Sequence, residues 1–158
     1  MNAAKLLEQS HMMVLQTLDD FPEREWDIPG ACGDWSVKDI IAHLTSYEHL
    51  LVDALTKLVS DAPTPYLDKF VGGQDEFNKS EVAERQYYTA QQVIDEYNET
   101  QLQSSDLLAK VPAEKITQAG TLPGYDKDRS VADLVSIIST HASEHCAQIK
   151  AFREKEHA

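Results

Sequence analysis

The stretch WSVKDIIAHLTSYEHLLVDALTKLVS, residues 35–60, predicts the most clearly bounded helix of the chain. Ser36 and Asp39 form a capping box, in which the serine side chain accepts a hydrogen bond from a backbone amide of the first helical turn. Hydrophobic residues then recur at the spacing expected of a helix with one buried face. These residues are Val37, Ile41, Leu44, Leu51, Leu55 and Leu58.

Three further helices are predicted around this one. Residues 3–20 carry a hydrophobic stripe at helical spacing, and residues 130–153 begin with a second capping box, Ser130 to Asp133. A more polar helix is expected over residues 89–110. No run of alternating hydrophobic and polar residues predicts a sheet.

The connection between the helices predicted at residues 35–60 and 89–110 begins with DAPTPYLDKFVGG, residues 61–73. Its two prolines and glycine pair predict irregular structure, with a short helical piece near residues 75–87. Pro112 and the segment AGTLPGYDKD, residues 119–128, are expected to break the chain again. The sequence therefore predicts one all-α domain over residues 1–158, a four-helix bundle with a long crossover connection.

Composition and charge narrow the classes of partner. Hydrophobic residues make up 42% and charged residues 26%, a balance typical of globular proteins. The net charge of −13 would repel nucleic acid and anionic membranes. There is no apolar run of the roughly 18 residues that a membrane span needs. With no signal-peptide pattern and only two cysteines, the expected location is cytoplasmic.

Histidines occupy core-facing positions in two of the predicted helices. His141 and His145 lie on the hydrophobic stripe between Ile138 and Ile149, and His43 borders the apolar face of residues 35–60. Without partners, three buried histidines would cost roughly 3–9 kcal/mol, comparable with the stability of a whole domain. The spacing leaves two interpretations open: a divalent cation on the three imidazoles, or ordinary core partners such as Ser104, Ser105 and Glu48.

Two motifs carry a resemblance to a known family. GDWSVKDIIAHLTSYE (residues 33–48) resembles the Trp-Ser…His-Leu segment of DinB-like proteins, also grouped with YfiT-like metalloenzymes. STHASEHCAQI (residues 139–149) is similar to the HxxxH of that family's final helix. The motifs occur in the family's order, and the resemblance spans nearly the whole chain.

The resemblance implies a four-helix bundle, often a homodimer, with a divalent metal on His43, His141 and His145. Zinc or nickel is usual in such sites. Relatives include transferases that use low-molecular-weight thiols such as bacillithiol or mycothiol. We therefore expect metal-assisted transfer or hydrolysis of a small-molecule substrate, with a thiol as nucleophile. The alternative is a bundle that binds a metal or small ligand without turnover, as a sequestering or resistance protein does.

Other polar residues are secondary candidates for the site. Tyr47 and Glu48 follow His43 within about one helical turn and are the candidate catalytic residues, Tyr47 as a donor to substrate and Glu48 as a base. His11 is a candidate fourth ligand or proton carrier, and Glu144 a candidate to orient a ligand. Asn78 resembles a position near the site in relatives. His49, His157 and Cys32 are expected at the surface or in loops, and Cys146 as a buried structural thiol.

Overall fold

The computed structural model describes residues 2–121 and 128–157, and the regular secondary structure in that part of the chain is helical. The prediction of an all-α chain is therefore confirmed. The α-helices are α1 (Ala3–Leu18), α2 (Val37–Val59), α3 (Pro65–Val71), α4 (Gln74–Glu84), α5 (Ala90–Lys110), α6 (Ala113–Thr117) and α7 (Val131–Glu156), with a 3₁₀ turn, η1 (Glu23–Glu25).

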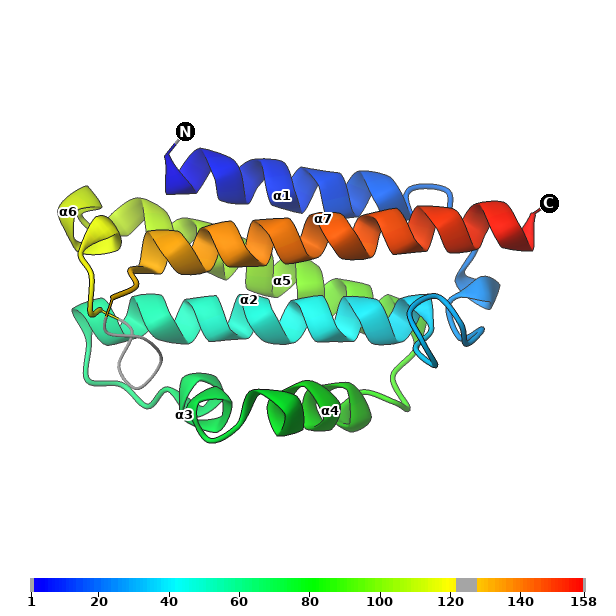
Figure 1. The fold of residues 1–158 in the computed structure, drawn as a ribbon, viewed down its shortest axis with the longest axis horizontal. Helices are drawn as coiled ribbons and strands as arrows, with labels where there is room; N and C mark the ends of the chain where they lie inside the picture. Colours follow the sequence, from blue (N-terminus) through cyan, green and yellow to red (C-terminus); the bar gives the residue numbers. More distant parts are fainter. Residues whose placement is uncertain (1, 122–127, 158) are drawn as a thin grey trace.

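The long helices α1, α2, α5 and α7 lie side by side (Figure 1). Helices α1 and α7 run in one direction, and α2 and α5 run in the other (Figure 1). Each long helix packs against two others, because α2 contacts α5 and α7, and α1 contacts the same two helices. Both predicted capping boxes are present, with the Ser36 and Ser130 side chains accepting from the backbone amides of Asp39 and Asp133.

The prediction that residues 61–73 are irregular is wrong, because helix α3 forms within them. Pro65 occupies its first position, where the missing N–H costs nothing. The Asp53 carboxylate of α2 accepts from the backbone amides of Tyr66 (2.7 Å) and Leu67 (3.1 Å) and so caps α3 from another helix. Leu67 and Phe70 are buried beneath it. Local sequence could not reveal this cap, which lies 13 residues away from Tyr66.

The other short helices agree more closely with the prediction. The piece expected near residues 75–87 is α4, which ends at Glu84. Helix α6 begins directly after Pro112, where only a break was expected. Together α3 and α4 run back along α2, so that α5 starts at the same end as α2 (Figure 1). This connection places α4 beside α2, where its residues help to form the site described below.

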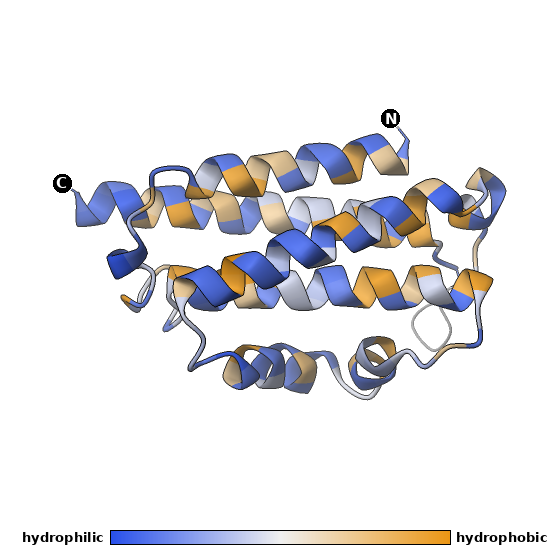
Figure 2. Cartoon of the chain, turned by 180° about the vertical axis from the view of Figure 1, so that it is seen from behind, coloured by the Kyte–Doolittle hydropathy of each residue, from blue (hydrophilic) through white to orange (hydrophobic). Residues whose placement is uncertain are grey.

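The hydrophobic core consists of two clusters separated by polar residues. One contains Leu7, Leu51 and Leu108, and the other contains Val14, Leu44 and Tyr97. On each of α1, α2 and α5, one buried polar residue lies in sequence between the residue of the first cluster and the residue of the second. These polar residues are His11, Glu48 and Ser104. Hydrophilic and hydrophobic segments are interspersed along the long helices (Figure 2). In the described part of the chain, no helix has the length and apolar character to cross a membrane.

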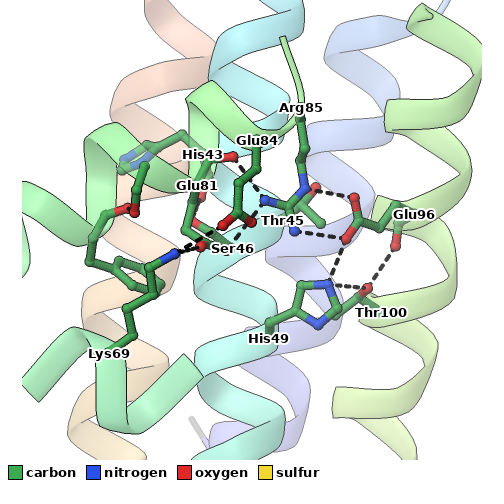
Figure 3. Close-up of polar contacts among 12 residues, drawn as sticks. His43, Thr45, Ser46, His49, Lys69, Glu81, Glu84, Arg85, Glu96 and Thr100 are labelled. Atoms are coloured by element: carbon green, nitrogen blue, oxygen red, sulfur yellow. Dashed lines mark hydrogen bonds and ion pairs between the residues drawn. The ribbon is translucent and has the colours of Figure 1, made fainter. Parts of the chain in front are cut away.

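A buried ion network joins α4 to α5 (Figure 3). The Arg85 guanidinium, 4% exposed, donates to both carboxylate oxygens of Glu96 (2.7 and 2.9 Å) and to Glu81 (3.3 Å). His49 contacts the same Glu96 carboxylate at 2.8 Å, and Lys69 of α3 pairs with Glu81. Burial alone would raise the pKa of Glu96, but the hydrogen bonds from Arg85 and His49 lower it to about 2. His49 was expected to be solvated; it is instead a member of this network.

Candidate metal centre

Three imidazoles from two helices converge at one point. His43 of α2 and His145 of α7 are buried, and His141 of α7 is half-buried. The Nε2 atom of His141 lies 3.2 Å from Nε2 of His43 and 3.0 Å from Nε2 of His145. One nitrogen from each ring lies within 4.8 Å of the other two. The three histidines are thus positioned to bind a metal ion.

The spacing of these nitrogens fits a metal centre. Tetrahedral Zn²⁺ with Zn–N bonds of about 2.0–2.1 Å separates its ligand atoms by about 3.3 Å. The two Nε2–Nε2 distances to His141, 3.0 and 3.2 Å, are close to this value. Imidazole nitrogen is a good ligand for zinc, nickel and copper, so the donor set suits a transition metal rather than Mg²⁺ or Ca²⁺.

Burial keeps the three rings neutral. Burial, and then the charges of His141 and His145, lowers the pKa of His43 to about 3. Burial, and then the charge of His145, lowers the pKa of His141 to about 4, although Glu144 opposes the shift. Burial also lowers the pKa of His145. Near neutral pH all three rings are therefore unprotonated, as metal ligands must be.

Hydrogen bonding among the rings alone cannot satisfy the cluster. Nδ1 of His145 faces Oε1 of Gln148 at 2.7 Å; since the amide oxygen only accepts, Nδ1 must carry the proton. Nε2 of His145 then has only a lone pair. A single proton on Nε2 of His141 can serve His145 or His43, but not both. A cation at the centre would accept all three lone pairs at once, which is the better fit to this arrangement.

A cleft of about 460 Å³ adjoins the imidazoles. His141 and Tyr47 line it together with other residues of α4 and α7, which form two of its walls. The α7 wall includes Thr140 and Glu144, and Arg129 and Asp133 also line the cleft, near the start of α7. The cluster is therefore accessible to a small molecule from the side on which His141 lies. Most of the segment AGTLPGYDKD, where a break in the chain was expected, lies outside the described residues, at 122–127.

Tyr47 is the predicted catalytic residue that lies beside the imidazoles. Its ring centre is 5.0 Å from that of His43 and 5.1 Å from that of His141. Its hydroxyl donates to Oδ1 of Asn78 (3.0 Å) and accepts from Nε2 of Gln74 (3.4 Å), both on α4. Helix α4 thus holds the Tyr47 hydroxyl in a fixed orientation at the cleft. Asn78, which the family resemblance singled out, lines the same cleft.

Glu48 and His11 lie apart from the three imidazoles, in a separate network. Nε2 of His11 and Oγ of Ser104 both contact Oε1 of Glu48 at 2.8 Å, and Oγ of Ser105 lies 3.4 Å from Nδ1 of His11. The core partners considered for the cluster, Ser104, Ser105 and Glu48, therefore belong to this separate network. The catalytic role of Glu48 stays a prediction, but these contacts favour a structural role. Neither residue lines the cleft.

The remaining candidates are placed as follows. Glu144 is exposed and lines the cleft near His141. Cys146 is buried, at 2% exposure, and burial raises the pKa of its thiol, as expected of a structural cysteine. Cys32 is half-buried in the loop before α2, and His157 at the end of α7 contacts Glu25.

Among the polar residues that sequence reasoning missed, Gln148 contacts His145 and Gln74 contacts Tyr47. Gln148 follows His145 by three residues, a spacing at which side chains of a helix meet, so its contact could have been expected from the sequence. Gln74 gave no such signal. It reaches the site only because the crossover returns along α2.

Comparison with known proteins gives one result that bears on this geometry. Residues 6–149 match the model of the DinB superfamily, and that range contains all three histidines of the cluster. Neither the search of curated proteins nor the search of solved structures gives a match. The family match covers most of the 158 residues and confirms the resemblance seen in the two motifs. The chain therefore belongs to the DinB superfamily.

Proposed function

We propose that this chain is a metal-dependent enzyme, a four-helix bundle whose His43, His141 and His145 hold Zn²⁺ or Ni²⁺. Its reaction is either a transfer in which a small-molecule thiol is the nucleophile, or a hydrolysis in which water is the nucleophile. The convergence of three Nε2 atoms, together with the adjoining cleft that His141 lines, supports this proposal above all. Three neutral protein ligands leave at least one coordination position open, as in catalytic zinc sites. When bound, the cation supplies a Lewis acid that lowers the pKa of a thiol or water.

The residues around the cleft would position the substrate and receive its proton. The Tyr47 hydroxyl, held by Asn78 and Gln74, can hydrogen-bond a polar group of the substrate. The Glu144 carboxylate lies at the same cleft and can accept the proton that a thiol loses. Lowered histidine pKa values keep protons from competing for the ligand nitrogens near neutral pH.

Several parts of the proposal rest on the family resemblance and the composition. The resemblance supports a low-molecular-weight thiol, zinc or nickel, and a homodimer. The net charge of −13 argues against nucleic acid and anionic membranes as partners. The cytoplasmic location remains a prediction from the cysteine content and the N-terminal sequence.

The deciding experiment is a turnover assay on protein reconstituted with Zn²⁺ or Ni²⁺. A cysteine-derived thiol and an aryl halide are supplied, and the thioether product is counted per protein molecule. We expect many metal-dependent turnovers, which are lost in His141→Ala and retained in Ser143→Ala, an exposed neighbour on α7. Metal binding with no more than one product per protein would favour the sequestering alternative. A wild-type protein that binds no metal after reconstitution would refute the metal centre itself.

A further inference from the structure

Gln148 contacts the side of the His145 ring that faces away from the cluster. Its Oε1 atom lies 2.7 Å from Nδ1 of His145, while Nε2 of the same ring lies 3.0 Å from Nε2 of His141. Gln148 is half-buried on α7 and follows His145 by three residues, so the two side chains occupy adjacent turns of one helix face. This contact is short and local, and it does not depend on the crossover.

The chemistry of this contact determines where the proton of a neutral His145 resides. An amide oxygen is an acceptor only, so the ring nitrogen that faces it must be the donor. The other ring nitrogen, Nε2, then carries a lone pair directed at the cluster. We propose that Gln148 is a positioning residue that holds His145 in the Nδ1–H tautomer and thereby keeps Nε2 ready to bind the metal. This inference rests on the proposed metal centre.

His43 provides the contrast within the same cluster. Its Nδ1 atom is buried and has no hydrogen-bond partner among the described residues. No described side chain therefore bonds the distal nitrogen of the His43 ring, whereas Gln148 bonds the distal nitrogen of the His145 ring. Because glutamine is neutral, it orients His145 without adding a second carboxylate beside Glu144. Groups that bond the distal nitrogen of a ligand histidine typically change metal affinity 10- to 100-fold.

The test compares two replacements that differ in acceptor ability. Gln148→Met keeps the approximate length of the side chain and removes the acceptor; Gln148→Glu keeps an acceptor. Zn²⁺ affinity is measured by competition calorimetry, and the His145 tautomer in metal-free protein by long-range ¹H–¹⁵N NMR. We expect Gln148→Met to bind Zn²⁺ about 10-fold more weakly or worse and to show mixed tautomers. Gln148→Glu and the control Ser143→Ala should stay within about threefold of wild type and keep Nδ1–H.

Two results would overturn the proposal. One is wild-type Zn²⁺ affinity together with an intact Nδ1–H tautomer in Gln148→Met. The other is an equal loss of affinity in Gln148→Met and Gln148→Glu, since the shape of Gln148 rather than its acceptor would then matter. The NMR measurement needs no metal. If wild type failed to bind Zn²⁺, the proposed function would fail, while the tautomer comparison would still decide whether Gln148 orients His145.

Discussion

His11 and His43 are both buried in the helix core, at 4% and 2% exposure, but their surroundings differ. His11 faces a carboxylate, because its Nε2 lies 2.8 Å from Glu48. His43 faces other imidazoles, and its Nε2 lies 3.2 Å from that of His141. One histidine therefore has a partner within the protein, whereas the other has only basic nitrogens around the atom that it presents.

The comparison shows which buried histidine is available to a ligand. Glu48 receives both His11 and Ser104, so the polar groups of that network satisfy one another. In the cluster, a proton on Nε2 of His141 can serve only one of the two Nε2–Nε2 contacts, and Nδ1 of His43 has no partner among the described atoms. A buried polar group without a partner costs about 1–3 kcal/mol. The first network is therefore complete without a ligand, whereas a cation bound by the three imidazoles would complete the second.

The largest expected difference between the two sites is in metal affinity. His141→Ala, His145→Ala and His43→Ala each remove one of three ligands, and we expect Zn²⁺ affinity to fall on the order of 1000-fold. His11→Ala serves as the matched control and should bind within about threefold of wild type. Calorimetry and metal analysis of the purified proteins provide the measurement. A comparable loss of Zn²⁺ affinity in His11→Ala would show that His11 belongs to the metal centre and does not differ from His43 in this respect.

The second difference is in stability. His11→Ala leaves the Glu48 carboxylate buried with only Ser104 as a side-chain partner, and we expect a loss of about 3 kcal/mol in the free energy of unfolding. Urea denaturation of the metal-free protein measures it. The double variant His11→Leu/Glu48→Leu should be less destabilised than the sum of the single changes, because no charge stays unpaired. If the losses of stability in the two single variants simply added up in the double variant, His11 and Glu48 would not interact.

The third test uses pH on the metal-free protein. The pKa of His43 is about 3 in the folded chain, against an ordinary value of 6.5. Between these two pKa values the unfolded chain binds a proton at His43 that the folded chain does not. The free energy of unfolding that depends on His43 is therefore fully present above pH 6.5 and declines below it. The decline should approach about 1.4 kcal/mol per pH unit until pH falls to near the folded pKa.

Denaturation curves between pH 7.5 and 4 would measure this decline. His43→Leu should flatten the curve, whereas Asn78→Ala, which removes no titratable group, should keep the wild-type slope. An unchanged slope in His43→Leu would mean that the ring is not held neutral by burial.

The smallest expected effect concerns the link between the cluster and α4. Asn78→Ala removes the acceptor of the Tyr47 hydroxyl, and we expect a loss of stability of about 1 kcal/mol with unchanged Zn²⁺ affinity. Thermal denaturation and calorimetry measure the two quantities, and Ser80→Ala on the same helix is the control. A large fall in metal affinity would show that α4 shapes the metal centre itself rather than the cleft beside it.

The long helices were predictable because their signals are local. Ser36 with Asp39 and Ser130 with Asp133 define helix starts by contacts within one turn, and both capping boxes form as expected. Helix α3 was missed because its cap, Asp53, comes from another helix. Likewise, His49 was expected in solvent because its partner Glu96 lies on α5, far away in sequence.

The sequence by itself determined the helical pattern, the core-facing positions of His141 and His145, and the family to which the chain belongs, since periodicity, capping and motif spacing lie within short segments. Only the tertiary structure decided which buried histidine meets a carboxylate and which meets other imidazoles. That choice depends on the packing of α1, α2, α5 and α7 around one another. Glu48 and His43 lie on the same helix five residues apart, and so point in different directions. The neighbours on those two sides, His11 and His141, are brought there by chain contacts that no local spacing specifies.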